Sequence, residues 1–343
     1  MAIDMGTANT IVAVKGRDIV LDEPSLIAVN ELSGEIVAYG QEAYDIRGRE
    51  GRDITVMAPL SGGVVADFER TKKMLAHFVK KSKSGGSQMS LQAVMSMLGD
   101  VTHVEQRALL NAAEDAHIGK VFMMEEALAA AFGAGVNPRD KRASAVIDLG
   151  AGTTNIAVVA KGSIVHARSE RLGSDEINVA LANHLRRHRG LQVGEETTEN
   201  LKTKFATAFM PEDISRSITV RGRDVQTGSP SAVEITIGEI YPVVEGIVRR
   251  VAQIVSDTLT ELRPEVASDI YDRGIIITGG GALLTGVEQY IRNFVNLPVT
   301  LSEEPRYATV RGLLSMFDEP ELLERVSRNE LHFLQNSEVP FEA

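Results

Sequence analysis

An α/β protein built from two related halves is the fold class that this sequence predicts, and three observations predict it. The chain has 343 residues, more than most single domains contain, so two domains are the default expectation. A short pattern occurs twice: residues 3–16 read IDMGTANTIVAVKG, and residues 147–162 read IDLGAGTTNIAVVAKG. Apolar strand-like runs alternate with helix-like stretches along the rest of the chain, which is typical of α/β proteins. Two halves that open with the same unit predict a cleft between them.

Each copy of the pattern predicts a strand, a turn and a second strand. The first strand ends at Asp4 or Asp148, a turn rich in Gly and Thr follows, and a Lys-Gly pair closes the second strand. Residues 274–278 predict a short buried strand before a glycine run. Helices are expected, from composition or apolar spacing, over residues 106–116, 178–187, 240–262 and 287–294.

Two polar segments predict a peripheral subdomain on each half. The expected organisation is a first-lobe core of residues 1–29, 67–141 and 306–343 with the subdomain 30–66, and a second-lobe core of residues 142–176 and 240–305 with the subdomain 177–239. Residues 82–87 predict a flexible loop, and the polar tail after Asp318 predicts a terminal helix with a frayed end.

Composition narrows the function classes. A formal net charge of -11 argues against a nucleic-acid partner, because binding to phosphates by bulk charge needs the opposite sign. The absence of cysteine excludes disulfides and thiolate metal sites. No apolar run approaches the roughly 20 residues that span a bilayer, and the first residues lack the pattern of a signal peptide. We therefore expect a cytoplasmic protein.

The two Gly/Thr turns predict phosphate binding. Glycine lets the backbone approach a phosphate closely, with N–H groups pointing at its oxygens. Two facing turns would clamp the β- and γ-phosphates of a nucleotide. The candidate residues are Gly6, Thr7, Ala8, Asn9 and Thr10 in the first turn, and Gly150, Ala151, Gly152, Thr153 and Thr154 in the second.

Asp4 and Asp148 occupy matching places in the two turns. A carboxylate beside a polyphosphate makes chemical sense with a cation, and Mg²⁺ prefers one or two carboxylates with phosphate oxygens and waters. An Asp that only caps its turn is the alternative for one copy alone. The repetition of the Asp in both copies favours a Mg²⁺ site, partly through water.

Two further motifs are weaker when taken alone. Gly279, Gly280 and Gly281 follow the strand at 274–278 and could let a nucleoside lie against bare backbone, although a tight turn would also explain them. Glu126 is the second of two acids at the start of an alanine-rich helix, where the helix dipole alone favours acids.

In this order, the motifs resemble the actin superfamily of ATPases, and closely resemble MreB-type bacterial actins, from Ile3 to about Arg311. The resemblance implies an actin-like ATPase fold with ATP and Mg²⁺ in the cleft and adenosine at Gly279–Gly281. It also implies that Glu199 and Lys202 contact ribose and adenine, and that Glu126 orients or activates the attacking water. An exposed i,i+3 ion pair is the alternative for Glu199 and Lys202.

The chain departs from the MreB pattern at several positions. Asn155 stands where an acid is usual, Ala127 where Pro is usual, and residues 94–98 replace a Gly-Val-Pro segment. An amide at Asn155 can hold a water but cannot accept its proton, so we expect slow ATP hydrolysis. The short Gly150–Gly152 pattern also resembles MamK, which forms filaments beside magnetic organelles.

The expected function is an ATP-binding protein that polymerises with itself into cytoskeletal filaments for cell shape or organisation. A MamK-like filament that positions an organelle and a monomeric kinase of the same fold are alternatives. A chaperone ATPase would need a further domain after residue 305, where few residues remain. Lysines at 80, 81 and 83 could give weak peripheral contact with the inner face of the membrane, although a solvated loop is the alternative.

Overall fold

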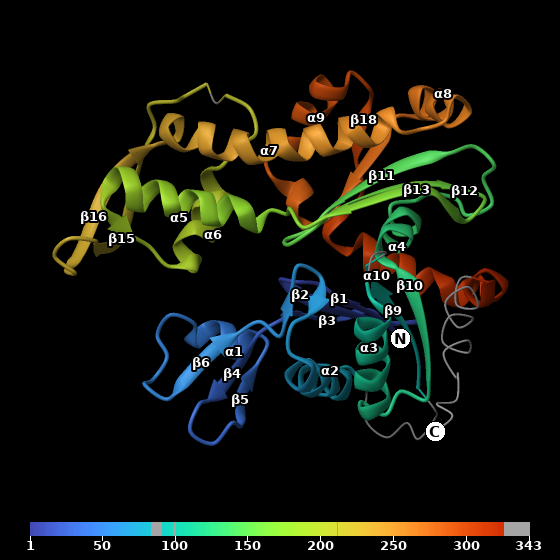
Figure 1. The fold of residues 1–343 in the computed structure, drawn as a ribbon, viewed down its shortest axis with the longest axis horizontal. Helices are drawn as coiled ribbons and strands as arrows, with labels where there is room; N and C mark the ends of the chain where they lie inside the picture. The colour runs from blue at the N-terminus through green and yellow to red at the C-terminus, as the bar shows by residue number, and fades with distance from the viewer. Residues whose placement is uncertain (84–90, 99–100, 211, 326–343) are drawn as a thin grey trace, which may run out of the picture. The chain divides into compact units, whose positions relative to one another are not determined.

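The structure, a computed structural model, describes residues 1–83, 91–98, 101–210 and 212–325. The chain divides into two compact units (Figure 1). Unit 1 comprises Met1–Lys141, Val159–Val165 and Tyr307–Ala343, and unit 2 comprises Arg142–Val158 and His166–Arg306. Most of the loop expected at 82–87 and most of the expected terminal helix lie outside the described residues, although residues 320–325 are helical.

Unit 1 is built on a five-stranded sheet in the order β10-β9-β1-β2-β3. The strands β1, β9 and β10 run parallel, whereas β2 and β3 follow β1 as antiparallel neighbours. The bounds are Ala2–Met5 for β1, Asn9–Val14 for β2, Asp18–Pro24 for β3, Gln92–Met97 for β9 and Lys120–Glu125 for β10. The carboxyl ends of β1, β9 and β10 therefore lie at one edge of the sheet.

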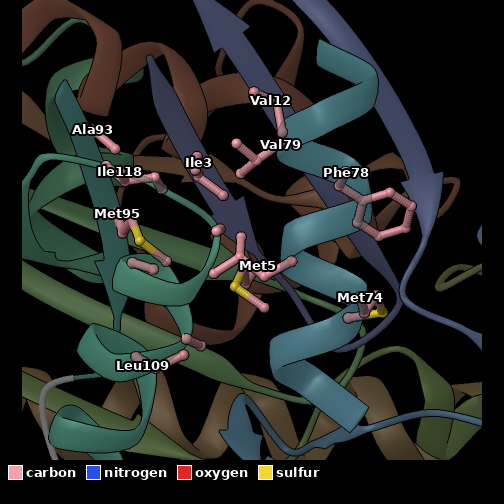
Figure 2. Packing of buried hydrophobic residues seen from close by; sticks show 14 of the residues in the cluster. Ile3, Met5, Val12, Met74, Phe78, Val79, Ala93, Met95, Leu109 and Ile118 are labelled. Carbon is pink, nitrogen blue, oxygen red and sulfur yellow. The ribbon is translucent and has the colours of Figure 1, made fainter. Parts of the chain in front are cut away.

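The helices α2 (Phe68–Ser82) and α3 (His103–Asp115) cover one face of this sheet. Figure 2 shows their packing, in which Phe78 and Leu109 join Ile3 and Met95 in one hydrophobic cluster. Both helices start at a side-chain cap: Asp67 accepts a hydrogen bond from the backbone N–H of Arg70, and Thr102 forms a capping box with the residue three positions on. Residues 80–82, expected in a loop, instead form the last turn of α2, where lysines suit the helix dipole.

Two other helices of unit 1 approach each other at backbone distance. A Cβ atom placed on Gly133, at the end of α4 (Glu126–Gly133), would lie 1.7 Å from the carbonyl oxygen of Ala308. A Cβ atom on Gly312, in α10 (Ala308–Ser315), would lie 1.8 Å from the carbonyl oxygen of Ala129. Only glycine fits at these two crossing points, because any side chain would push the helices apart.

A small sheet of unit 1 has the strand order β5-β4-β6 and a core of its own around Leu26, Ala28 and Ala43. Its strands are β4 (Ile27–Asn30), β5 (Ile36–Tyr39) and β6 (Ile54–Met57), with the helix α1 (Gln41–Ile46) beside them. The short hairpin of β7 (Leu60–Ser61) and β8 (Val64–Val65) then leads into α2.

Unit 2 repeats the arrangement of the first sheet. Its five strands lie in the order β13-β12-β11-β17-β18, with β11, β17 and β18 parallel. The bounds are Ser144–Leu149 for β11, Thr154–Ala160 for β12, Ser163–Glu170 for β13, Ile275–Thr278 for β17 and Val299–Leu301 for β18. The duplication seen in the sequence is therefore present in the topology: three strands consecutive in the chain, then two parallel strands beside the first of them.

The remaining elements of unit 2 include three of the expected helices. The helices are α5 (Asp175–Arg189), α6 (Glu195–Phe205), α7 (Ile237–Thr260), α8 (Pro264–Arg273) and α9 (Val287–Val295), and a sheet of β14 (Leu191–Gln192), β15 (Ser217–Asp224) and β16 (Pro230–Thr236) lies beside α5. The helices expected near 178–187, 240–262 and 287–294 are confirmed as α5, α7 and α9, and the one near 106–116 as α3 in unit 1. Within the described ranges, no helix is long and apolar enough to cross a membrane.

Candidate nucleotide site

The candidate residues of unit 1 gather at the carboxyl edge of its parallel strands. Asp4 lies near the end of β1, and Glu126 begins α4 directly after β10 ends at Glu125. In α/β sheets, this edge is where ligands commonly bind. Burial raises the pKa of the Asp4 carboxyl to about 6, whereas a hydrogen bond that it accepts from the Ser96 hydroxyl, 2.7 Å from its Oδ1, acts in the opposite direction.

The side chains of the first turn mostly hold the turn itself. Thr10 is fully buried, with its hydroxyl 2.9 Å from that of Ser25, which donates to the carbonyl oxygen of Gly6. The Asn9 amide donates to Asp22 Oδ1 at 3.0 Å, and the Thr7 hydroxyl oxygen accepts from the backbone N–H of residue 63 at 2.9 Å. Ala8 is exposed. Contact with a phosphate at this turn would therefore fall mainly to the backbone of residues 6–9.

The second turn is tied to the start of α5. The carbonyl oxygens of Gly150 and Ala151 accept hydrogen bonds from the backbone N–H groups of residues 174 and 175, at 3.0 and 2.9 Å. Gly173 permits this approach, because a Cβ atom there would lie 2.1 Å from the Ala151 carbonyl oxygen. Thr154 is fully buried and donates to the Leu172 carbonyl oxygen at 2.5 Å. Gly152 and Thr153 complete the turn, with Thr153 almost fully buried.

The third glycine element packs directly on the second turn. Asp148 pairs with Thr278 across β11 and β17, so Gly279 follows beside it. Gly279 has a φ of 87°, and a Cβ atom there would lie 2.4 Å from Asp148 Oδ1 and from the carbonyl oxygen of Leu149. A Cβ atom on Gly281 would meet the Leu149 side chain at 2.6 Å, whereas one on Gly280 would meet nothing within 4 Å. Gly279 therefore brings bare backbone against Asp148, and Gly280 leaves its own backbone open.

Asn155 is a buried amide without a partner. Its side chain is 2% exposed, and neither its Oδ1 nor its Nδ2 has a hydrogen-bond partner. Buried polar groups are almost always hydrogen-bonded, because an unpaired one costs about 1–3 kcal/mol. An amide left in this state, one residue after the second turn, fits a site that a bound water or ligand completes.

Glu199 and Lys202 form a network rather than a simple surface pair. Lys202 Nζ lies 2.8 Å from Glu199 Oε2, which is the expected i,i+3 ion pair. The Lys202 side chain is only 11% exposed, however, and also approaches Asp175 and the Ser174 carbonyl oxygen at the start of α5. Asn178 donates to the same Glu199 oxygen at 2.7 Å. The network joins α6 to the part of α5 that holds the second turn.

Neither turn carries a ready-made metal cage. Among the described residues, no group of three or more His, Cys, Asp or Glu side chains could hold a metal ion. Mg²⁺ bound through one carboxylate, phosphate oxygens and waters needs no such group. Asp4 in unit 1 and Asp148 in unit 2 each present the single carboxylate that this mode of binding uses.

Residues on neighbouring elements, which the sequence did not predict, support the candidate site. Ser96 and Ser25 contact Asp4 and the first turn, and Asn178 contacts Glu199. Ser96 lies in the segment 94–98 named above, which contains the end of β9, where site residues of α/β sheets gather. No local pattern pointed to Asn178 or Ser25, because their contacts depend on tertiary packing.

Comparisons with known proteins agree over nearly the whole chain. A family model described as MreB/Mbl protein matches residues 1–325. The cell shape-determining protein Mbl of Bacillus subtilis is 37% identical over 318 residues, which cover 93% of this chain and 95% of that protein. The cell shape-determining protein MreB of Escherichia coli is 36% identical over 317 residues, covering 91% of each.

Solved structures show the same fold. MreB5 of Spiroplasma citri bound to ADP has a TM-score of 0.87 at 30% identity, covering 95% of this chain and 97% of that one. The same protein bound to AMPPNP also has a TM-score of 0.87 at 30% identity, covering 93% and 95%. A MamK double helical filament has a TM-score of 0.76 at 20% identity, covering 92% and 97%. This chain therefore has the actin-like fold and belongs to the MreB/Mbl family.

Proposed function

We propose that this chain binds ATP with Mg²⁺ and assembles with copies of itself into cytoskeletal filaments that act in cell shape. The observation that best supports nucleotide binding is the packing of Gly279 on Asp148, which brings bare backbone, a carboxylate and the second turn together. Supporting it, MreB5 has been solved with ADP and with AMPPNP. The names of Mbl and MreB support the role in cell shape, and the MamK filament supports assembly.

The proposed site assigns one task to each group of residues. The turns at 6–10 and 150–154 bind phosphates, Gly279–Gly281 contact the adenosine, and Glu199 with Lys202 contacts ribose and adenine. Asp4 and Asp148 hold Mg²⁺, partly through water. A bound Mg²⁺ would neutralise phosphate charge. The subdomains 30–66 and 177–239 belong to the same proposal, as do a cytoplasmic location, weak peripheral membrane contact and the absence of a nucleic-acid partner.

Slow hydrolysis follows from the two residues proposed at the attacking water. A water oxygen forms a bond to the γ-phosphorus as the bond to the β,γ-bridging oxygen breaks, and the water loses a proton. Glu126 can accept that proton. Asn155 can hold the water by a hydrogen bond but has no basic site for the proton. The proposed site therefore has one proton acceptor, Glu126. The resemblance to MreB-type proteins implies that a second acid is usual at the position of Asn155.

Calorimetry with Asp148→Asn tests nucleotide binding. The amide keeps the size of the carboxylate but removes its charge, so we expect Mg-ATP affinity to fall about 10-fold or more. Asp272→Asn, which alters an exposed partner of Arg142 in the same unit, is the matched control and should bind normally. Equal affinity in Asp148→Asn and wild type would contradict the assignment of the site.

Sedimentation tests assembly separately. With ATP and Mg²⁺, the wild-type protein should pellet and appear as long filaments in electron micrographs, because a head-to-tail contact that does not close generates open polymers. A monomeric kinase of the same fold would stay in the supernatant at every protein concentration. That result, obtained with a protein that binds ATP, would retain the site and exclude the filament.

A further inference from the structure

Ser96 is a buried hydroxyl at the centre of the parallel strand edge in unit 1. It is 7% exposed and lies near the end of β9, the strand between β1 and β10. Ile3 and Met95 are paired in register and face the hydrophobic core. Because side chains alternate along a strand, Asp4 and Ser96, one residue further, face the opposite side of the sheet, where α10 packs.

Two hydrogen bonds give the Ser96 hydroxyl a direction. It donates to Asp4 Oδ1 at 2.7 Å, and its oxygen faces the backbone N–H of Met5 at 3.4 Å. An N–H can only donate, so the oxygen accepts there and the hydroxyl hydrogen points at Asp4. The terminal torsion of an Asp side chain is otherwise broad. By holding Oδ1, the hydroxyl therefore restricts the rotation of the Asp4 carboxylate.

We propose that Ser96 is a positioning residue for the cation of a bound Mg-nucleotide, acting through Asp4. The inference rests on the proposed function, which places Mg²⁺ at Asp4. Mg²⁺ requires near-ideal octahedral geometry and keeps several of its waters. A carboxylate whose orientation is fixed before binding accepts one of those waters, or the ion itself, without first losing rotational freedom. Ser96 thus strengthens the coupling between Mg²⁺ and nucleotide rather than nucleotide binding in general.

The test measures the dissociation constant of ATP by calorimetry, once with Mg²⁺ and once with EDTA. The quantity compared between variants is the dissociation constant in EDTA divided by the dissociation constant with Mg²⁺. Ser96→Ala should lower this ratio roughly 10-fold, because a hydrogen bond to a charged group is lost, and should leave the affinity in EDTA within about 2-fold of wild type. Ser96→Thr keeps the hydroxyl and suits a strand, so it should retain the wild-type ratio.

Ser82→Ala is the matched control. Ser82 is another buried serine of unit 1, 3% exposed, and its hydroxyl has no hydrogen-bond partner. Its loss removes the same atom without touching the site, so the ratio should not change. In an Asp4→Asn background, Ser96→Ala should have no further effect on the ratio, because the charge through which it acts is already gone. Thermal unfolding of each variant confirms that the fold is retained.

Different outcomes would contradict the role of Ser96 and the proposed function on which that role rests. A wild-type protein whose ATP affinity is the same with Mg²⁺ and with EDTA would contradict the proposed metal site itself. A wild-type protein with strong Mg²⁺ coupling that Ser96→Ala keeps would overturn the role of Ser96 alone. Equal weakening of Ser96→Ala with and without Mg²⁺ would also overturn it, because that pattern belongs to a purely structural residue.

Discussion

Asn155 is buried, and the resemblance to MreB-type proteins implies that an acid is usual at this position. A carboxylate there would be an unpaired buried charge in the nucleotide-free protein, which costs more than an unpaired amide. An unpaired amide at this position therefore costs less than an unpaired carboxylate, and it could still form a hydrogen bond to the proposed water. In the proposed site the proton acceptor is Glu126, which belongs to the other unit of the chain.

This division of labour predicts the effect of two substitutions on hydrolysis. Glu126→Ala should lower the steady-state ATPase rate by about 10²–10⁴-fold and leave ATP binding and assembly largely unchanged, because a positioned proton acceptor is typically worth that much. Asn155→Asp should hydrolyse ATP at an equal or higher rate. Phosphate release and pelleting measure the two properties separately. Wild-type turnover in Glu126→Ala, or loss of activity in an Asn155→Asp variant that still binds ATP, would show that the roles are wrongly divided.

For single residues, the sequence predicted the backbone turns better than the contacts of the side chains. Glycine and Asp could be assigned to turns because their roles are local. The hydrogen-bond partners of Asn9 and Thr10 could not be predicted. These partners, Asp22 and Ser25, lie on β3 and in the loop after it, and the register of β2 and β3 sets their contacts. Both residues are expected at the phosphates, and in the structure their side chains also hold the first turn.

Among the elements, the pair α4 and α10 depends most on two small residues. Gly133 and Gly312 let the backbones touch where the helices cross, and α4 begins with Glu126. A side chain at either crossing would move the helix that carries the proposed proton acceptor. The sequence did not predict this contact, because a glycine in a helix can mark a close crossing, a kink or nothing, and the partner helix lies far along the chain.

Two helical glycines give a matched prediction. Gly312→Ala should destabilise the protein by about 1–3 kcal/mol or more, because its methyl group would overlap the Ala129 carbonyl oxygen. Gly246→Ala, in α7, has open space within 4 Å and should stabilise by roughly 0.5–1 kcal/mol through helix propensity. Chemical denaturation measures both. If Gly312→Ala is as stable as Gly246→Ala, the close crossing is incorrect.

For the whole molecule, the net charge of -11 opposes the assembly that we propose. Like-charged copies repel one another over a Debye length of about 30 Å at 0.01 M salt and about 8 Å at 0.15 M. With Mg-ATP held constant, the protein concentration needed for pelleting should therefore fall severalfold as KCl rises between these values. A sucrose series of equal osmolarity is the control. A steady rise in that concentration with salt would mean that attractive ion pairs between copies dominate.

The sequence revealed the duplicated architecture because each copy keeps its Asp, glycines and apolar strands, and the two sheets do share one strand order. The places where the chain passes between the units were harder to predict. Val159–Val165, which begins inside the second copy of the pattern, belongs to unit 1, although its residues read as a continuation of the strands of unit 2. Periodicity describes strands, and it does not show which unit a strand end packs against.

The split of unit 1 along the chain affects how the protein can fold during its synthesis. Its helix α10 packs on β1 and α4 but follows all of unit 2 in the chain. At about 5–20 residues per second, a ribosome needs roughly 10–30 s to pass from Lys141 to Tyr307. During that interval the nascent first unit lacks α10, so the apolar surfaces that α10 will cover stay open to solvent or to chaperones. The segment that holds the candidate site residues of unit 2 can complete its own sheet before unit 1 receives α10.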